Sequence, residues 1–260
     1  MNALTCFDLT GRVALVTGAG RGIGQAMAVA LADAGADIAC LYNTRYEETA
    51  GLIQERGRRF LPIQLDLAQA TPDALRKAVQ QVVDGLGRLD ILVNNAGIIR
   101  RTPAMEYSEE DWEAVLQVNL NSVFYLSQAA ACAMMQQGIQ QGYRGKIIQV
   151  ASVLSFQGGI LVPAYTAAKH ALTGITKALA NEWAAEGIGV NAIAPGYIVT
   201  DNTEALRSDQ TRSQAILARI PAGRWGEADD LAGVTIFLAS AASNYVHGST
   251  FVVDGGWLAR

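Results

Sequence analysis

Tyr165 and Lys169 are the two residues in this sequence whose types and spacing point most directly to chemistry. They stand four positions apart in PAYTAAKHALTGITKALANEW, where Ala, Leu and Lys favour a helix, so both side chains should project from one helix face. A phenol ionises at about pH 10, and a nearby ammonium favours the phenolate and lowers that pKa. The pair can therefore act as a general acid and base, although a half-buried ring beside a solvated charge gives the same spacing on many helices.

A glycine-rich turn near the N-terminus predicts a second site. The apolar segment 12–17 reads as a buried strand, runs into GAGRGIG at positions 18–24, and is followed by an Ala-rich helix. Gly18, Gly22 and Gly24 allow a tight turn and a close approach to a pyrophosphate, while the helix N-terminus offers free N–H groups to the anion. This order of elements favours a dinucleotide site over a turn that binds nothing.

Short apolar runs alternate with helical segments along the whole chain. This pattern of repeated βαβ units predicts one α/β domain over residues 1–260, a Rossmann-type doubly wound parallel sheet of about seven strands with helices on both faces. Ligands collect at the carboxyl ends of such strands, so Gly18, Asp66, Asn94, Ser152 and Pro195 should meet at one cleft. We expect strands near residues 12–17, 37–41, 60–65, 90–93, 145–150, 188–193 and 250–253, and helices near 22–34, 45–57, 71–86, 108–137, 163–186, 203–219 and 227–239.

The composition favours a protein that associates with copies of itself. Half of the 260 residues are hydrophobic and 17% are charged, which is below the usual quarter or so, and much surface should therefore be buried in a core or a subunit contact. The helices near 108–137 and 163–186 are apolar, and Trp257 and Leu258 should be buried against a neighbour, so we expect a homotetramer. The net charge of −4 argues against nucleic acid or an anionic membrane as the main partner.

Cysteine usage and the N-terminal segment indicate a cytoplasmic protein. Cys6, Cys40 and Cys132 are odd in number and widely spaced, which is typical of reduced packing residues rather than a disulfide framework. No Cys or His cluster has the spacing of a metal site, and His170 and His247 are isolated. MNALTCFDLTGR lacks the pattern of a signal peptide, and no run reaches the roughly 18 apolar residues of a membrane helix.

Taken together, the motifs resemble those of the short-chain dehydrogenase/reductase family. The glycines follow the pattern TGxxxGxG, and the further matches occur in the family's order across essentially the whole chain. The resemblance implies hydride transfer between a nicotinamide cofactor, NAD or NADP, and a carbonyl or hydroxyl group. The matching residues are the NNAG of positions 94–97, Asn119, Ser152, Tyr165, Lys169, Pro195, Gly196 and Thr200.

The resemblance also implies roles for the polar residues. Tyr165 protonates a carbonyl oxygen, or accepts the proton in the reverse direction, while Lys169 lowers its pKa and binds the nicotinamide ribose. Ser152 donates to the same oxygen, where alkoxide charge develops. Asn119 holds a water that links Lys169 to solvent, satisfies backbone groups at a helix irregularity, or does both. 

Cofactor contacts follow from the same resemblance. Asp66 contacts the adenine, Thr200 fixes the carboxamide, and the cofactor-binding set comprises Gly18, Arg21, Gly22, Ile23, Gly24, Tyr42, Asp66, Asn94, Ala96, Gly97, Tyr165, Lys169, Pro195, Gly196, Ile198 and Thr200. An acidic residue at the end of the second strand would hold the 2′-OH of NAD, but Tyr42 occupies that position. Arg21 and Arg45 can pair with a 2′-phosphate, which favours NADP, whereas the closer resemblance described next favours NAD. Both cofactors stay open.

A closer resemblance concerns the substrate. The segments NNAGIIRR, ASVLSFQGGILVPAYTAAKH, NAIAPGYIVTDNTEALR, RIPAGRWGEADDL and VDGGWLAR are similar to a branch of the family that acts on six-carbon deoxy sugar acids in uronate and pectin breakdown. Arg100 or Arg101 can meet the substrate carboxylate through a bidentate hydrogen bond, or can be solvated in a loop. The expected substrate contacts are Arg100, Arg101, Ser152, Gln157, Tyr165 and Asn202.

Two alternatives compete with a sugar-acid dehydrogenase. One is an enzyme of the same family acting on another polyol, a gluconate, a steroid, a ketone or an acyl carrier substrate. The other is a non-catalytic nucleotide-sensing protein on the same fold. The second is disfavoured because Asn119, Ser152, Tyr165 and Lys169 are all present, and mere binding does not require a tyrosine hydroxyl beside an ammonium.

Overall fold

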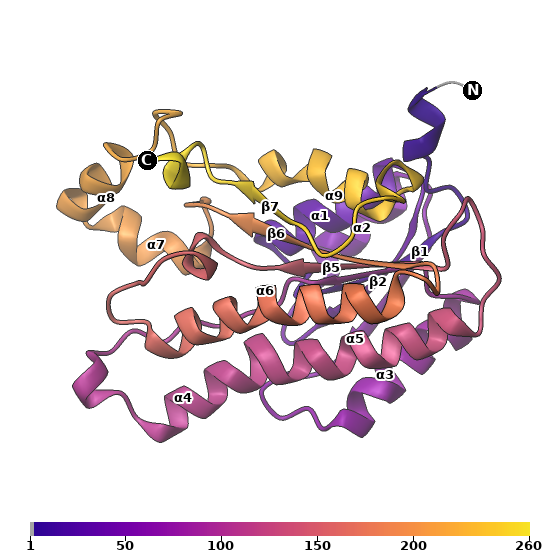
Figure 1. The fold of residues 1–260 in the computed structure, drawn as a ribbon, viewed down its shortest axis with the longest axis horizontal. Coiled ribbons are helices and arrows are strands. Elements are labelled where there is room, and N and C mark those ends of the chain that lie inside the picture. The colour runs from indigo at the N-terminus through magenta and orange to yellow at the C-terminus, as the bar shows by residue number, and fades with distance from the viewer. Residues whose placement is uncertain (1–2) are drawn as a thin grey trace.

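A computed structural model describes residues 3–260, and a single parallel sheet organises them (Figure 1). Its seven strands stand in the order β3-β2-β1-β4-β5-β6-β7, so the chain winds outward from β1 in both directions. All seven expected strands and the doubly wound topology are confirmed. The assignment of the whole chain to one domain stays a prediction, because Met1 and Asn2 lie outside the described residues. The strands are β1 Val13–Thr17, β2 Asp37–Tyr42, β3 Phe60–Gln64, β4 Ile91–Asn94, β5 Gly145–Val150, β6 Ile188–Pro195 and β7 Thr250–Val253.

Both faces of the sheet are buried because alternate side chains of each strand enter different cores. In β1, Val13 and Leu15 join one cluster and Ala14 and Val16 join the other, and all four are 0% exposed. Helices α3, α5 and α6 cover the first face, whereas α1, α2 and α9 cover the second (Figure 1). This two-sided burial explains why the strands are continuous apolar runs.

The helices match the expected segments except where local hydrogen bonds interrupt them. The segment expected as one helix over 108–137 contains a π-helical turn, Gln117–Asn121. The segment 203–219 forms two helices, because the Asp209 carboxylate accepts from the Arg212 N–H at 3.0 Å and starts a second helix there. The helices are α1 Gly22–Asp33, α2 Glu47–Glu55, α3 Pro72–Leu86, α4 Glu109–Leu116, α5 Ser122–Met135, α6 Pro163–Trp183, α7 Asp201–Ser208, α8 Gln210–Leu217 and α9 Ala232–Ala239.

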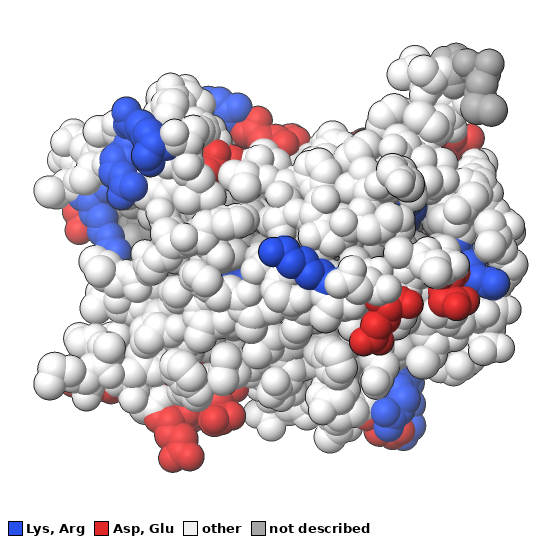
Figure 2. Space-filling model, viewed as in Figure 1, with Lys and Arg blue, Asp and Glu red and all other residues white. Residues whose placement is uncertain are grey.

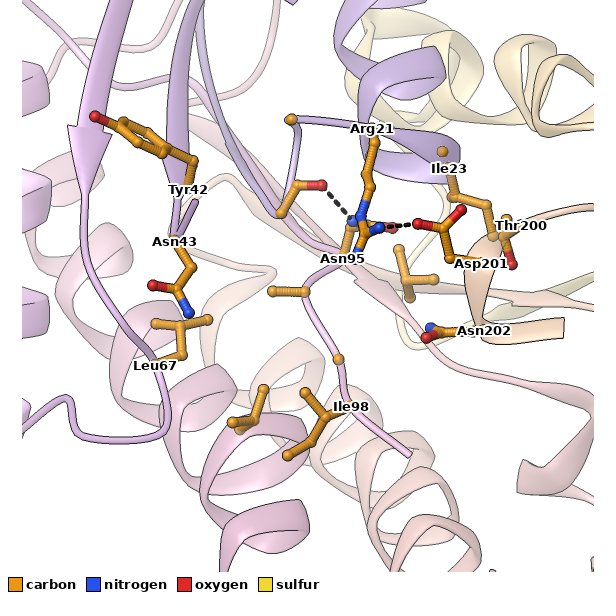
Figure 3. A pocket seen from close by; sticks show the side chains of 18 of the residues that line it. Arg21, Ile23, Tyr42, Asn43, Leu67, Asn95, Ile98, Thr200, Asp201 and Asn202 are labelled. Carbon is orange, nitrogen blue, oxygen red and sulfur yellow. Dashed lines mark hydrogen bonds and ion pairs between the residues drawn. The ribbon is translucent and has the colours of Figure 1, made fainter. Parts of the chain in front are cut away.

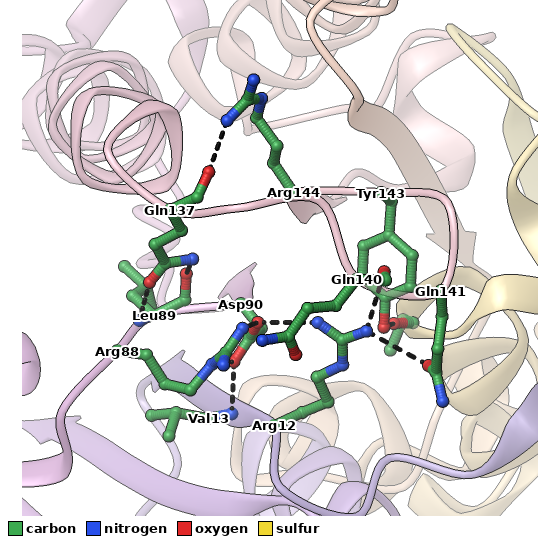
Figure 4. Close-up of polar contacts among 11 residues, drawn as sticks. Arg12, Val13, Arg88, Leu89, Asp90, Gln137, Gln140, Gln141, Tyr143 and Arg144 are labelled. Carbon is green, nitrogen blue, oxygen red and sulfur yellow. Dashed lines mark hydrogen bonds and ion pairs between the residues drawn. The ribbon is translucent and has the colours of Figure 1, made fainter.

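A buried charge cluster holds the amino edge of the sheet (Figure 4). The fully buried Asp90 carboxylate accepts from Arg12 Nη1 at 3.0 Å and from Arg88 Nη2 at 2.6 Å, and it also accepts from the Val13 N–H at 2.9 Å. Arg12 continues to the carbonyl of Gln140 at 2.9 Å and so fastens the loop between α5 and β5. These contacts are structural, since functional side chains of this fold gather at the opposite edge.

Cys6, Cys40 and Cys132 are all unpaired, and Cys132 is exposed rather than packed in the core. Among residues 3–260, no helix combines the length and the apolar character that crossing a bilayer requires.

Candidate active site

A cleft of about 530 Å³ lies at the carboxyl ends of the strands, where the sequence places the motifs (Figure 3). Its volume is in the range of cofactor sites. The cleft brings together most of the predicted site residues, namely Gly18, Arg21, Gly22, Ile23, Gly24, Tyr42, Asp66, Ala96, Gly97, Arg100, Ser152, Tyr165, Lys169, Pro195, Gly196, Ile198, Thr200 and Asn202.

The glycine turn forms a cradle that side chains would fill. Gly18 has φ of +65°, a region that L side chains rarely adopt, and a Cβ on Gly24 would lie 2.4 Å from the Gly18 carbonyl oxygen. Helix α1 begins at Gly22 without a side-chain cap from Arg21, so its first N–H groups are open to an anion. This geometry fits the pyrophosphate of a dinucleotide.

The adenosine end of the cleft carries no acidic residue at the end of β2. Tyr42 ends that strand and lines the cleft, followed by Asn43, Thr44 and Arg45. Asp66 also lines the cleft, and its Oδ1 accepts from the Ala68 N–H at 2.9 Å, which fixes the loop after β3. The arrangement can accept an adenosine with or without a 2′-phosphate.

Lys169 lies on α6 with its ammonium directed to the sheet. Its Nζ donates to the Val150 carbonyl at 2.6 Å and lies 5.5 Å from the centre of the Tyr165 ring. Pro163 at the first position of α6 starts the helix and sets both residues on the face toward the end of β5. Burial lowers the pKa of Lys169 to about 8, because desolvation penalises the ammonium.

Ser152 and Arg101 are the groups that favour a Tyr165 phenolate. Burial raises the pKa of Tyr165, while a hydrogen bond with Ser152 and the charge of Arg101 act in the opposite direction. The expectation that Lys169 lowers the pKa of Tyr165 stays a prediction. Ser152 is held by its own turn, since its Oγ accepts from the Leu154 N–H at 3.1 Å.

Asn119 bridges two segments from inside the π-helical turn. Its Oδ1 accepts from the Ile98 N–H at 3.1 Å, and its Nδ2 donates to the carbonyls of Ile98 at 2.8 Å and Val115 at 3.0 Å. The side chain is fully buried and lies outside the set of cleft-lining residues. It therefore satisfies backbone groups at a helix irregularity, one of the two expected roles, and the water relay stays a prediction.

Asn94 does not line the cleft as expected, and its neighbour Asn95 does. The Asn94 side chain is 2% exposed and donates to Ser127 Oγ and to Gln149 Oε1, both at 3.0 Å. Asn95 instead donates to the Thr17 carbonyl at 2.9 Å and to the Gly18 carbonyl at 3.4 Å, and the second bond ties it to the glycine turn (Figure 3). Successive side chains of a strand face opposite ways, which separates the two.

The two arginines after NNAGII have different surroundings. Arg100 lines the cleft, but its Nε lies 3.3 Å from the Asp111 carboxylate. Arg101 is half-buried, donates through Nη2 to the Asn202 carbonyl at 2.9 Å, and lies close enough to Tyr165 for its charge to affect the phenol. Neither Arg101 nor Gln157 is among the cleft-lining residues, so direct contacts of these two stay predictions.

Sequence reasoning missed Thr17 and Asp201. Thr17 Oγ1 accepts from the Asn95 and Ala96 N–H groups at 3.0 and 2.9 Å, and the Thr of TGxxxGxG was the available signal. Asp201 forms an ion pair with Arg21 across the cleft (Figure 3). Nothing local in the sequence pairs residues so far apart along the chain.

Known proteins resemble this chain from end to end. The family model described as enoyl-(acyl carrier protein) reductase matches residues 18–258. The 2-dehydro-3-deoxy-D-gluconate 5-dehydrogenase of Dickeya dadantii is 54% identical over 99% of both chains. A crystal structure from Agrobacterium tumefaciens with bound NADP, assigned as a 2-deoxy-D-gluconate 3-dehydrogenase, is 53% identical with a TM-score of 0.90, and the match covers 98% of this chain and 99% of that one.

A third relative has both a cofactor and a small acid in its crystal. This gluconate 5-dehydrogenase from Burkholderia cenocepacia, in complex with NADP and tartrate, is 41% identical, has a TM-score of 0.91 and covers 100% of each chain. The predicted family is thus confirmed by sequence and by structure. The cleft, its Ser152-Tyr165-Lys169 constellation and these likenesses establish that the chain belongs to the short-chain dehydrogenase/reductase family and is an NAD(P)-dependent oxidoreductase acting on CH–OH and C=O groups.

Proposed function

We propose that the chain transfers a hydride between the nicotinamide of NAD(P) and a keto or hydroxy group of a six-carbon deoxy sugar acid. This is the substrate class that the name of the related 2-dehydro-3-deoxy-D-gluconate 5-dehydrogenases indicates. The observation that carries the proposal is the cleft that Ser152 and Tyr165 line together, with the Arg101 guanidinium close enough for its charge to act on the Tyr165 phenol. That arrangement suits a carbonyl whose molecule also bears a carboxylate. The 54% identity to a sugar-acid dehydrogenase over 99% of both chains supports the same substrate class.

The chain's own residues have separate tasks in this proposal. The bound nicotinamide supplies or accepts the hydride. Tyr165 gives its hydroxyl proton to the substrate oxygen during reduction, and Ser152 donates a hydrogen bond to that oxygen as negative charge develops. Lys169, anchored on the Val150 carbonyl, orients the ribose and returns a proton to the tyrosine. 

Arg101 is the proposed partner of the substrate carboxylate. Arg100 is already paired with the Asp111 carboxylate at 3.3 Å. The Arg101 guanidinium instead donates to the uncharged carbonyl of Asn202. Burial and the nearby charge of Arg212 lower the pKa of Arg101, because both disfavour its positive charge. An incoming carboxylate supplies a negative charge and can bind the guanidinium fork in a bidentate manner.

Arg21 and Arg45 are proposed to bind the 2′-phosphate when the cofactor is NADP. Both line the adenosine half of the cleft, and the end of β2 provides no carboxylate that would repel a phosphate. NAD lacks this phosphate but shares the pyrophosphate cradle of the glycine turn. We therefore propose that the enzyme accepts both cofactors and binds NADP more tightly.

A homotetramer is the proposed assembly. The molecular face that carries α5 and α6 is mostly uncharged (Figure 2), and Tyr125 on α5 is 37% exposed there. Such a surface is suited to contact with a second copy. Trp257 no longer supports this proposal, because its own chain buries it to 3% exposure, with the Arg219 guanidinium 3.9 Å from the centre of its ring. Static light scattering at micromolar concentration tests the assembly, and a monomeric mass would contradict it.

A cytoplasmic location is also proposed, on the basis of the three unpaired cysteines. Mass spectrometry after alkylation in cells tests it. Recovery of Cys132, the exposed cysteine, in an oxidised form under normal growth would count against a reducing compartment.

The substrate proposal is tested by steady-state kinetics of the purified enzyme. Each cofactor is combined with 2-dehydro-3-deoxy-D-gluconate, gluconate, a neutral polyol and a neutral ketone of similar size. We expect the highest kcat/KM with the deoxyketo sugar acid. A higher kcat/KM with either neutral compound would refute the substrate class while leaving the oxidoreductase assignment intact.

A further inference from the structure

Asp201, the first residue of α7, contacts two arginines from distant parts of the chain, and Figure 3 shows its ion pair with the first of them, Arg21. Its Oδ2 pairs with Arg21 Nη1 of the glycine turn and lies 3.7 Å from Arg45 Nη2 in the loop after β2. All three residues line the same cleft, and their side chains are 57% to 58% exposed. One carboxylate thus lies near both guanidinium groups that are proposed to bind the 2′-phosphate of NADP.

The two backbone segments that carry these arginines lie against each other. Gly20 of the glycine turn packs on the loop after β2 so closely that a Cβ there would lie 2.0 Å from the Arg45 carbonyl oxygen. The Arg21 and Arg45 side chains therefore start from backbones in direct contact. The two like charges need a counter-ion, and the end of β2 does not supply one.

Helix α7 does not need the Asp201 carboxylate for its own start. Thr200 and Thr203 cap this helix reciprocally, and the Thr203 hydroxyl also donates to the Ile198 carbonyl at 2.7 Å. Arg207 adds a bond to the Thr200 carbonyl at 3.3 Å. Asp201 can therefore leave the arginines by a side-chain rotation, with the helix in place.

We propose that Asp201 determines cofactor selectivity by competing with the 2′-phosphate of NADP for Arg21 and Arg45. The inference rests on the proposed function of these two arginines. A phosphate monoester carries a charge of about −1.5 to −2 and three acceptor oxygens, so it displaces a single exposed carboxylate from paired guanidinium groups. NAD carries a hydroxyl at that position and leaves Asp201 in place. Asp201 thus weakens NADP binding and leaves NAD binding unchanged.

The test measures binding of cofactor fragments that lack the nicotinamide, so it is independent of turnover. Isothermal titration calorimetry compares adenosine 2′,5′-bisphosphate with AMP on the wild type, Asp201→Asn, Arg21→Gln and Glu204→Gln. Glu204 is an exposed acid on the same helix, and its variant makes the same change in net charge. Asp201→Asn should bind the bisphosphate about two- to five-fold more tightly, the range expected for one exposed ion pair, with AMP unchanged. Glu204→Gln should match the wild type.

The outcomes separate this inference from the assignment beneath it. If Arg21→Gln weakens the bisphosphate selectively but Asp201→Asn binds it as the wild type does, the arginines read the phosphate and the competition by Asp201 is refuted. If Asp201→Asn weakens both ligands, Asp201 fastens α7 over the cofactor and does not compete. If Arg21→Gln leaves bisphosphate binding unchanged, the phosphate assignment fails, and the inference fails with it. If Glu204→Gln gains as much affinity for the bisphosphate as Asp201→Asn does, the effect comes from net charge, and the specific competition by Asp201 is refuted.

Discussion

Replacing Arg101 with Gln should damage catalysis on an acidic substrate far more than on a neutral one. The guanidinium is half-buried and keeps one bond to the Asn202 carbonyl, so its free N–H groups can meet a carboxylate at the mouth of the cleft. A hydrogen bond to a charged partner contributes about 1.5 to 3 kcal/mol. Fully buried charge pairs contribute more, but Arg101 is partly exposed, so the smaller range applies to its pair with the substrate carboxylate. We therefore expect kcat/KM for the deoxyketo sugar acid to fall by about 10- to 150-fold.

The same variant should shift the pH profile for every substrate. The positive charge of Arg101 favours the Tyr165 phenolate and lowers the phenol's pKa, so its removal raises that pKa. Oxidation of an alcohol requires the phenolate as base, and its rising limb should move to higher pH for the acid and for the neutral alcohol alike. The carboxylate effect appears as substrate selectivity, while the tyrosine effect appears as this common shift.

Arg100→Gln is the matched control for the prediction. Arg100 lines the cleft but is paired with Asp111 at 3.3 Å, so the loss of its charge should change kcat/KM by less than about three-fold. Both variants are assayed with the sugar acid and with a neutral ketone of similar size. Equal losses on the two substrates in Arg101→Gln, or selective damage in Arg100→Gln alone, would show that Arg101 does not bind the carboxylate.

Three further variants test the site and the fold. Tyr165→Phe should lower kcat about 100- to 10,000-fold with cofactor Kd within a few fold, because the ring stays and the proton is lost; retention of a tenth of wild-type kcat would rule out Tyr165 as proton donor. Lys169→Ala should reduce kcat and weaken cofactor binding in a fluorescence titration, and an unchanged Kd would contradict the ribose contact. Lys146→Met should remove a pH dependence of stability, because burial lowers the pKa of Lys146 to about 8 from 10.5. Below pH 8 the buried ammonium destabilises the wild-type fold. As the pH rises from 8 to about 10.5, the free energy of unfolding of the wild type should increase by about 3 kcal/mol. Urea unfolding of both proteins between these values measures the difference, and parallel curves would refute it.

The sequence predicts the sheet well because the strands are buried on both faces. Val13 to Val16 are fully buried, and a continuous apolar run bounded by turns has few alternatives in an α/β chain. The interruption at Asp209 was not predicted, and the irregularity at Asn119 was expected only as one role that the family resemblance allows, because each depends on a few local hydrogen bonds. Asp209 caps α8 with one 3.0 Å bond, and the π-helical turn aims Asn119 at the backbone of Ile98. At both places the spacing of apolar residues in the sequence stays typical of a continuous helix.

Within the site, the sequence predicts which motifs converge but not how each side chain turns. Asn94 and Asn95 are adjacent and identical in type, and only the sheet shows that Asn94 faces Gln149 while Asn95 faces the glycine turn. The pairing of Asp201 with Arg21 depends on how α7 crosses the cleft, which no local pattern encodes. Conversely, the burial of Trp257 by its own chain shows that an apolar ending does not by itself indicate a subunit contact.

Two buried lysines at opposite ends of β5 show why location must accompany a perturbed pKa in identifying a catalytic group. Desolvation lowers the pKa of both Lys146 and Lys169 to about 8. Lys146 lies at the amino end, where its ammonium binds Ser243 Oγ at 3.2 Å and Asn244 Oδ1 at 3.0 Å, away from the cleft. Lys169 contacts the Val150 carbonyl at the carboxyl end and lines the cleft. Because both lysines are buried but lie at opposite edges of the sheet, topology makes Lys169 the candidate for the chemistry, whereas Lys146 lies where this fold does not bind ligands.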